Sequence, residues 1–317
     1  MGNVTLKKIA ELSEVSIRTV SRALKNHPGV KPETGQRVLE LAERLGYTPN
    51  IAARNLRLNH SNVVGIIMSS NYSNNVAIRK VNDLQKQLEG EGLFPLLGHL
   101  PKETEDLRQI LQEWAGLVST VVFLNWRSQL NPAVVLHGLP QQFIFVDIPN
   151  ISDFHSLTID RSRGIRNGIA HLVESGRRRI ARCGNIPNRE SGFMQAFNDY
   201  ADKEVKHFYF EAPSMFNDGI ELAPQLISND IDAVFFDTDR MAYGFLKYCW
   251  QHAIAVPQQI AVIGFDDDPW GEYSCPALST VAHPIADINE EIVELALNPA
   301  KPQKKEFPTR FIKRESV

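Results

Sequence analysis

The sequence predicts an all-α helix-turn-helix head followed by a larger α/β body in two lobes. In the first 47 of the 317 residues, short stretches with apolar residues at helical spacing each follow a capping residue. From Val63 onward, short apolar runs alternate with amphipathic stretches, which is typical of βαβ units and a doubly wound parallel sheet. That alternation restarts after Asp160, so we expect two successive α/β lobes with a cleft between them.

Three helices are predicted in the head. Thr5 and Ser16 are suited to cap the first two, Pro32 stands near the first turn of the third, and Gly46 ends it. Helical spacing assigns these apolar residues to a common core: Leu6, Ile9, Ala10, Leu12, Val20, Ala23, Leu24, Val38, Leu41, Ala42 and Leu45. Two short helices joined by a three-residue turn and closed by a third form the helix-turn-helix pattern.

The second helix keeps a polar face after its core residues are assigned. This face carries Ile17, Arg18, Ser21 and Arg22, and an arginine in the major groove can contact guanine O6 and N7 together. Hydroxyl side chains near the helix N-termini are candidates for phosphate contacts: Thr5, Ser16, Thr19 and Thr34. On these residues alone, a three-helix protein-interaction module remains an alternative.

Charge is unevenly distributed along the chain. Residues 1–60 hold ten basic and five acidic residues, whereas the remainder holds 24 basic and 32 acidic ones. A basic head on an acidic body indicates that only the head contacts a polyanion.

The head also resembles a known family. The segments VTLKKIA from Val4, TVSRAL from Thr19 and GYTPN from Gly46 are similar to the lactose/galactose repressor (LacI/GalR) family. The resemblance implies a DNA-binding domain at 1–47, a hinge helix at 48–60 that orders on DNA, and an effector-binding and dimerisation domain at 61–317. It implies further DNA contacts from Asn50, Ala53, Arg54 and Leu56, with Leu56 wedged into a central base step of the minor groove.

Motifs of the body resemble the same family. They are GRRRIA from Gly176, RESGF from Arg189, FFDTDRMA from Phe235 and VIGFDD from Val262. The resemblance implies a periplasmic-binding-protein-like body whose chain crosses three times between lobes. We expect the crossings near Asp160, near His283 and around Ala300, which gives an N-lobe of about 61–160 and 283–300 and a C-lobe of about 161–282 and 301–317.

Ligands of open α/β sheets bind beyond the carboxyl ends of the strands. Candidate effector-binding residues fall there: Asp147, Arg189, Thr238, Asp239 and Asp266, with Tyr72 as an aromatic that could cover a sugar face. In the family, an arginine at 189 and a carboxylate at 266 hydrogen-bond the hydroxyls of a sugar or nucleoside. We therefore expect a small-molecule effector, sugar-like or nucleoside-like, and no cofactor. The stretch SSNYSNNV from Ser69 departs from the family pattern, which leaves the effector open.

Other classes of protein find little support in the sequence. No GxSxG, Walker A, HExxH or GxGxxG motif occurs, and the Asp266–Asp268 run has no second oxygen-rich element for a metal. No apolar run is long enough to cross a membrane and no signal peptide is evident, so cytoplasmic location is expected. We expect a repressor that binds a pseudo-palindromic operator as a homodimer. An enzymatic body on a helix-turn-helix, or a solute-binding protein for transport, are the alternatives.

Overall fold

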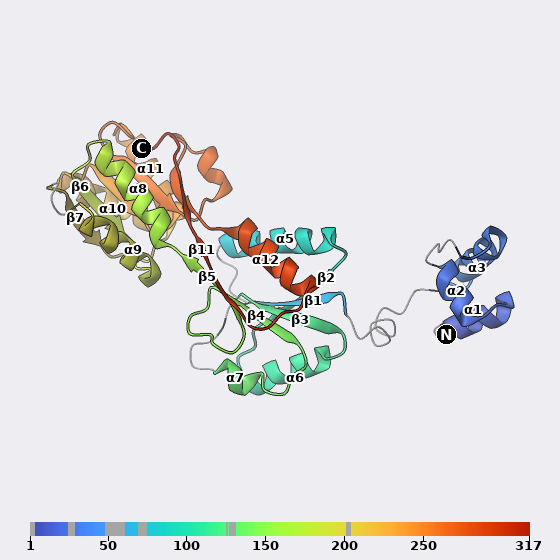
Figure 1. The fold of residues 1–317 in the computed structure, drawn as a ribbon. Coiled ribbons are helices and arrows are strands. Elements are labelled where there is room, and N and C mark those ends of the chain that lie inside the picture. Colours follow the sequence, from blue (N-terminus) through green and yellow to red (C-terminus); the bar gives the residue numbers. More distant parts are fainter. Residues whose placement is uncertain are drawn as a thin grey trace. The chain divides into compact units, whose positions relative to one another are not determined.

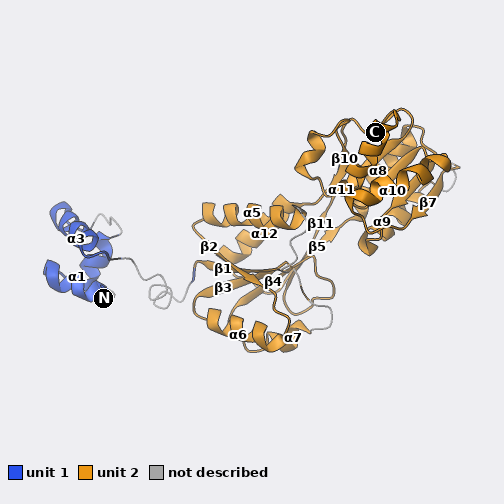
Figure 2. Ribbon diagram, turned by 180° about the vertical axis from the view of Figure 1, so that it is seen from behind, with its two compact units in different colours: residues 1–61 blue, residues 62–317 orange. Residues whose placement is uncertain are grey.

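The computed structural model describes residues 4–24, 29–47, 61–68, 75–124, 126, 131–200 and 204–317. The chain forms two units, residues 1–61 and 62–317, which are coloured separately in Figure 2. Five residues expected in functional sites lie outside the described ranges: Asn50, Ala53, Arg54, Leu56 and Tyr72.

The first unit contains the three predicted helices, α1 (Leu6–Ser13), α2 (Ile17–Ala23) and α3 (Pro32–Arg44). Thr5 Oγ1 accepts a hydrogen bond from the Lys8 amide at 3.3 Å, and Ser16 Oγ accepts one from the Thr19 amide at 3.1 Å. Both predicted caps are thus confirmed. Gly46 follows α3 with φ at +62°, the left-handed conformation that glycine adopts without strain.

The prediction that Leu12 belongs to the core of the head is wrong. Leu12 is half-exposed, and Ser13 is buried in its place, with its hydroxyl donating to the Ile9 carbonyl at 2.6 Å. Ser13 follows Ile9 by four residues and Ala10 by three, so the helical repeat places it on the inward face. The polar side chain remains stable there because its hydrogen bond stays within α1.

The second unit begins with a six-stranded parallel sheet. Its order is β11-β5-β4-β3-β1-β2, with α5 and α12 on one face and α6 and α7 on the other (Figure 1). The strands are β1 (Val63–Met68), β2 (Phe94–His99), β3 (Val118–Phe123), β4 (Gln142–Val146), β5 (His155–Asp160) and β11 (Lys304–Pro308); the helices are α5 (Asn75–Gly90), α6 (Thr104–Trp114), α7 (Pro132–Val135) and α12 (Ile285–Leu297).

A second six-stranded sheet repeats this arrangement in the order β12-β10-β9-β8-β6-β7. Strand β12 runs antiparallel to β10, and the other pairs are parallel. Apolar side chains of α8 and α9 cover one face, and those of α10 and α11 cover the other. The elements are β6 (Arg179–Cys183), β7 (Lys206–Phe210), β8 (Ala233–Phe236), β9 (Ala261–Phe265), β10 (Ser279–Ala282), β12 (Arg310–Ile312), α8 (Ser162–Glu174), α9 (Pro187–Asn198), α10 (Phe216–Ser228), α11 (Asp239–Gln251) and the 3₁₀ helix η2 (Pro269–Glu272).

The chain passes between the two sheets at three places. It does so after β5, between β10 and α12, and at Thr309, which separates β11 from β12. The last passage differs from the expected one around Ala300, because β11 pairs with β5 and so extends the first sheet to Pro308. The apolar signal of β11 is confined to Phe307, so the sequence pattern did not reveal this edge strand.

Thr309 also joins two of these passages. Its amide donates to the Asp160 carbonyl at 2.8 Å, and its hydroxyl lies 3.0 Å from the same oxygen. The Gly164 amide donates to the Thr309 hydroxyl at 3.1 Å. Two connections that are far apart in the sequence are therefore bonded together.

Both sheets have the doubly wound order in which the second strand lies outside the first and the third lies inside. In such sheets, ligands bind beyond the carboxyl ends of the strands. The loops after β4, β9 and β10 leave those ends, and they supply Asp147, Asp266 and His283. In the described part of the chain, no helix is long and apolar enough to cross a membrane.

Candidate functional site

The head presents its candidate DNA-contacting side chains on α2. Ile17 and Arg18 are exposed in the first turn of α2, and Ser21 and Arg22 follow one turn later, partly buried. The Ser16 and Thr19 hydroxyls lie 2.9 Å apart at the start of the helix, beside amides that could meet a phosphate. Thr34 lies in the first turn of α3.

The orientation of α3 in the head is fixed partly by Arg37. Its guanidinium donates to the carbonyl of Ser13 at 2.9 Å, which links α3 to the end of α1. The buried residues Ile9, Val20 and Val38, one from each helix, meet in the core below. The exposed face of α2 is thus presented by a packed scaffold.

In the body, seven ionisable side chains gather near the passages between the two sheets. We call them the charged cluster: Arg79, Lys80, Asp147, Arg161, Arg189, Asp266 and His283. They come from α5, α9 and the loops after β4, β5, β9 and β10. The structure therefore brings together three of the predicted effector residues, Asp147, Arg189 and Asp266.

Asp147 is engaged by Arg161. Nη1 of Arg161 donates to Asp147 Oδ1 at 2.9 Å, and Nη2 donates to Oδ2. A bidentate pair of this kind fixes both side chains. Asp147 has φ at +59°, so the backbone turns sharply where β4 ends.

Arg189 and Asp266 form the buried centre of the cluster. Arg189, only 6% exposed, donates from Nη2 to Asp266 Oδ1 at 2.9 Å, and its guanidinium stacks 4.0 Å from the Phe265 ring centroid. His283 Nε2 lies 3.3 Å from the same Oδ1. Burial raises the pKa of Asp266 to about 6, although Arg189 and Lys80 oppose the rise.

Burial also determines the state of His283. It lowers the pKa of the imidazole well below its usual value, and the nearby charge of Lys80 lowers it further. The ring is therefore neutral at pH 7 and can donate to Asp266 or accept from a ligand, depending on its tautomer.

Arg79 connects the two lobes directly. From α5 on the first sheet, its guanidinium donates to the Asp266 carbonyl at 3.1 Å and to the Asp267 carbonyl. Lys80 follows it in α5, where burial lowers the pKa of the ammonium while Asp147 and Asp266 raise it. In the described part of the chain, no ion pair engages this ammonium.

The other two predicted effector residues have internal partners. Thr238 caps α11: its hydroxyl accepts from the Met241 amide at 3.2 Å and donates to the Ser214 carbonyl at 2.8 Å. Asp239 is buried and accepts from the Thr280 hydroxyl at 2.5 Å and the Asp268 amide at 2.7 Å. Burial raises the pKa of Asp239 to about 8. Asp239 thus supports the loop that carries Asp266, whereas Thr238 fixes the start of α11.

Sequence reasoning missed Arg79, Lys80 and Arg161 and treated His283 only as a passage between lobes. Arg161 could have been recognised from the sequence, because it directly follows β5 at the first expected passage between the lobes. Arg79 and Lys80 had none, because basic residues on an amphipathic helix usually face solvent. In the described residues, no group of three or more His, Cys, Asp or Glu could hold a metal ion.

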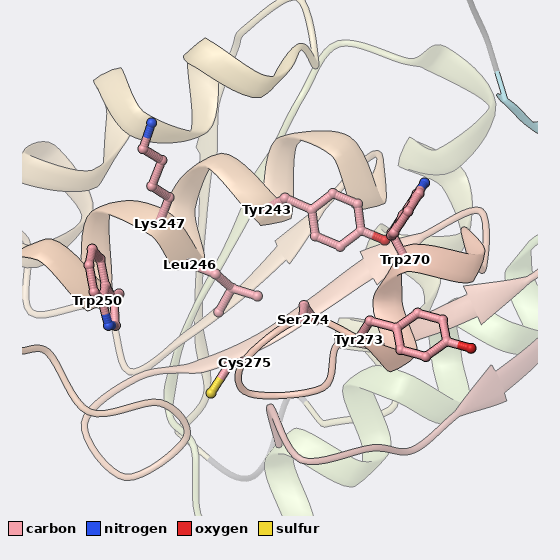
Figure 3. Close-up of a pocket in the computed structure, with 8 residues that line it drawn as sticks. All are labelled: Tyr243, Leu246, Lys247, Trp250, Trp270, Tyr273, Ser274 and Cys275. Atoms are coloured by element: carbon pink, nitrogen blue, oxygen red, sulfur yellow. The ribbon is translucent and has the colours of Figure 1, made fainter.

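A separate hollow lies on the second lobe between α11 and the η2 segment (Figure 3). Its lining includes Tyr243, Leu246, Trp250, Trp270 and Tyr273. Trp250 and Tyr273 are 78% and 77% exposed, unusually high values for large aromatic side chains. This surface shares no residue with the charged cluster.

Comparison with protein families gives two matches. Residues 5–50 match the family of bacterial regulatory proteins of the lacI type, and residues 169–317 match the periplasmic binding protein-like domain. The chain therefore carries a lacI-type DNA-binding domain ahead of a periplasmic-binding-protein-like domain. The resemblance noted in the sequence and the predicted fold class are thereby confirmed.

Curated relatives are similar to this chain over nearly its whole length. The chain is 28% identical to the probable transcriptional repressor ExuR of Bacillus subtilis, covering 99% of this chain and 98% of that protein. It is 26% identical to catabolite control protein A of Priestia megaterium, covering 92% and 91%. This chain is accordingly a transcriptional regulator, with a DNA-binding and a ligand-binding domain, and not an enzyme.

Among solved structures, the fold matches a lac repressor dimer bound to operator and the anti-inducer ONPF. The TM-score is 0.81 at 20% identity, with 99% of each chain covered. A cellobiose complex of the regulator CelR matches with a TM-score of 0.67 at 22% identity, covering 99% of this chain and 100% of that one. Both matches concern the fold of the two-lobed body and the helical head.

Proposed function

We propose that this lacI-family protein is a repressor that binds a pseudo-palindromic operator as a homodimer and responds to a small hydroxylated effector at the charged cluster. The observation that carries the effector half is the buried Arg189–Asp266 pair, because it presents a donor and an acceptor at the carboxyl ends of the strands. We place its action in the cytoplasm, with the operator.

On the DNA side, Ile17, Arg18, Ser21 and Arg22 are proposed to face base edges from α2. Thr5, Ser16, Thr19 and Thr34 are proposed to contact phosphates. The hinge contacts of Asn50, Ala53, Arg54 and Leu56 rest on the family resemblance and lie outside the described residues.

The proposed homodimer is supported by apolar surface on the body. Trp250, Trp270 and Tyr273 are exposed together around the hollow of Figure 3. On the first sheet, Phe94 and Leu97 are exposed on β2, an edge strand. Exposed aromatic groups and an open edge strand are typical of surfaces covered by a partner.

Effector and operator are proposed to act on each other through the lobes. Because Arg79 joins α5 to the loop after β9, a ligand at the cluster would change contacts between the lobes. The ligand then changes operator affinity, and by thermodynamic linkage the operator changes ligand affinity by the same factor. A relative with the name ribose operon repressor is consistent with a sugar-related signal.

The experiment is operator selection from a random DNA pool, followed by titration of the selected site with the full-length protein. We expect a site with two half-sites, bound by a dimer in sedimentation analysis. Trp250→Ser combined with Tyr273→Ser should weaken the dimer without unfolding the body. A single half-site bound by a monomer would overturn the dimer proposal, and failure to select any sequence would overturn the operator proposal.

The effector half is tested with Arg189→Gln. This variant should still bind the selected operator and should lose the response to any effector found. Arg166→Gln is the matched control, because Arg166 forms an exposed pair with Asp199 in the same lobe, away from the cluster. A retained response in Arg189→Gln would show that the effector binds elsewhere.

A further inference from the structure

We infer that the charged cluster recognises an anionic, polyhydroxylated ligand, such as a sugar acid or a sugar phosphate, and discriminates against neutral sugars. This rests on the proposed function, since it names the chemical class of the effector at the same site. Three features of the cluster support it: a surplus of positive charge, donors left without partners, and an acceptor that remains available for a ligand hydroxyl.

The cluster contains more positive than negative charge. Arg79, Lys80, Arg161 and Arg189 are cationic, whereas its carboxylates are Asp147 and Asp266. His283 is neutral at pH 7, because burial lowers its pKa. The surplus is thus two positive charges.

The neighbouring carboxylates of Asp237, Asp239 and Asp267 do not offset this surplus. Asp237 accepts a bidentate pair from Arg182 at 2.9 and 2.8 Å, and Asp267 pairs with Arg314 at 2.7 Å. Asp239 has its pKa raised to about 8 by burial and is mostly protonated at pH 7. The sequence stretches that follow β1 and β3, residues 69–74 and 127–130, contain no Asp or Glu.

Several donors of the cluster have no partner among the described residues. Nε of Arg161 and Nε of Arg189 are buried without a hydrogen bond, and no ion pair holds the Lys80 ammonium. Leaving a buried donor without a hydrogen bond is costly, and charge-assisted hydrogen bonds to an anion recover that cost. A carboxylate or phosphate can accept such hydrogen bonds and balance the charge, whereas a neutral hydroxyl is only a weak acceptor.

An acceptor for hydroxyl groups remains as well. Arg189 and His283 both approach Oδ1 of Asp266, so Oδ2 keeps its lone pairs. A ligand that joins one anionic group to several hydroxyls would therefore use the surplus cations and this oxygen together. That combination distinguishes a sugar acid or sugar phosphate from a bare anion such as inorganic phosphate.

The test is binding of matched probes to the full-length protein by thermal shift and calorimetry. The probes are glucose, glucuronate and glucose 6-phosphate, then galactose with galacturonate, ribose with ribose 5-phosphate, and inorganic phosphate alone. We expect at least one anionic sugar to bind at least tenfold more tightly than its neutral counterpart and than inorganic phosphate. The carboxylate and phosphate members identify which anion is preferred.

Variants then assign the effect to the cluster. Lys80→Gln should weaken binding of the preferred anion at least tenfold. It should also reduce the ratio between the affinity for the anionic sugar and the affinity for the neutral sugar. Lys86→Gln is the control, because Lys86 lies on the same helix and is exposed; it should leave binding unchanged. Operator affinity without ligand is measured for both variants, and Lys86→Gln should match the wild type.

The outcomes separate this inference from the function it rests on. A neutral sugar that binds as tightly as its anionic counterpart and alters operator affinity would overturn the anion inference and leave the proposed regulator intact. Equal binding by Lys80→Gln and wild type would also overturn it. If no probe binds while the operator is bound normally, both the anion inference and the effector half of the proposed function fail.

Discussion

The head and the charged cluster of the body reach their candidate partners by opposite means. In the head, Ile17, Arg18 and Arg22 lie within six residues of one another on one helix and are exposed or partly buried. In the cluster, Arg79 and Asp266 come from segments 187 residues apart, and Arg189 is nearly inaccessible to solvent.

Because of this difference, substitutions in the two regions should affect stability and binding differently. A side chain in the DNA-facing part of the head contributes little to folding, so its replacement should affect binding alone. A buried ion pair in the body stabilises the fold, so its replacement should lower the stability of the body in addition to any effect on ligand binding.

The largest effect is expected from Arg182→Ala in the second lobe. Arg182 and Asp237 are 4% and 0% exposed in their side chains, so the variant leaves a buried carboxylate without its partner. We expect a loss of about 3–5 kcal/mol in the free energy of unfolding, measured by urea denaturation. Arg166→Ala, from an exposed pair, should cost no more than about 1 kcal/mol. Equal losses in the two variants would break the contrast.

Arg22→Ala should show the opposite pattern. If Arg22 contacts a base, the variant loses roughly 1–3 kcal/mol of binding at one operator position and leaves the unfolding midpoint unchanged. The measurement is a titration of operators substituted base by base. A uniform loss across all sequences, with a smaller salt dependence, would instead identify Arg22 as a phosphate contact.

A pH effect is expected from Asp239. Its folded pKa of about 8 lies above the ordinary 3.8, so the folded protein holds a proton that the unfolded chain has released. Its contribution to stability is full below pH 4 and is lost as the pH rises through about 8. Between pH 7 and 8 the free energy of unfolding should fall by up to about 1.4 kcal/mol per pH unit.

Urea midpoints at pH 7 and 8 check this dependence. Asp239→Asn should have the flatter pH profile, whatever its stability at pH 7, because it has no proton to lose. If the variant keeps the slope of the wild type, another group is responsible for it.

The smallest effect is expected at the cap of α2. Ser16→Ala removes the hydrogen bond to the Thr19 amide and should cost about 1 kcal/mol of local stability. Hydrogen exchange of the α2 amides in the full-length protein measures this opening. Ser21→Ala, within the same helix, should not speed that exchange, because alanine favours helix. Faster exchange in Ser21→Ala would mean that the DNA-facing side also supports the fold.

Sequence reasoning was strongest where a feature depends on nearby residues. The caps Thr5 and Ser16, the start of α3 at Pro32 and the end at Gly46 are local, and each was predicted. The alternating pattern also predicted two sheets that are parallel except at the edge strand β12, because fully buried strands such as β1 appear as continuous apolar runs.

The charged cluster was only partly predictable. Asp147, Arg189 and Asp266 follow from the rule that sites lie beyond strand ends, but their partners depend on how the lobes meet. Nothing in the sequence around Arg79 distinguishes it from a solvent-facing arginine, since its partners are two backbone carbonyls of a distant loop. The capping role of Thr238 was missed because its motif also suggested a ligand contact.

The bond between Thr309 and the Asp160 carbonyl has a mechanical consequence. Because it fastens the first and third connections to each other, these two cannot bend independently. The body then has two joints, one at this fastened pair and one at His283–Pro284, in place of three. Two points define a single axis, so the lobes should rotate about one line. A ligand would then change the angle between the lobes in one fixed direction.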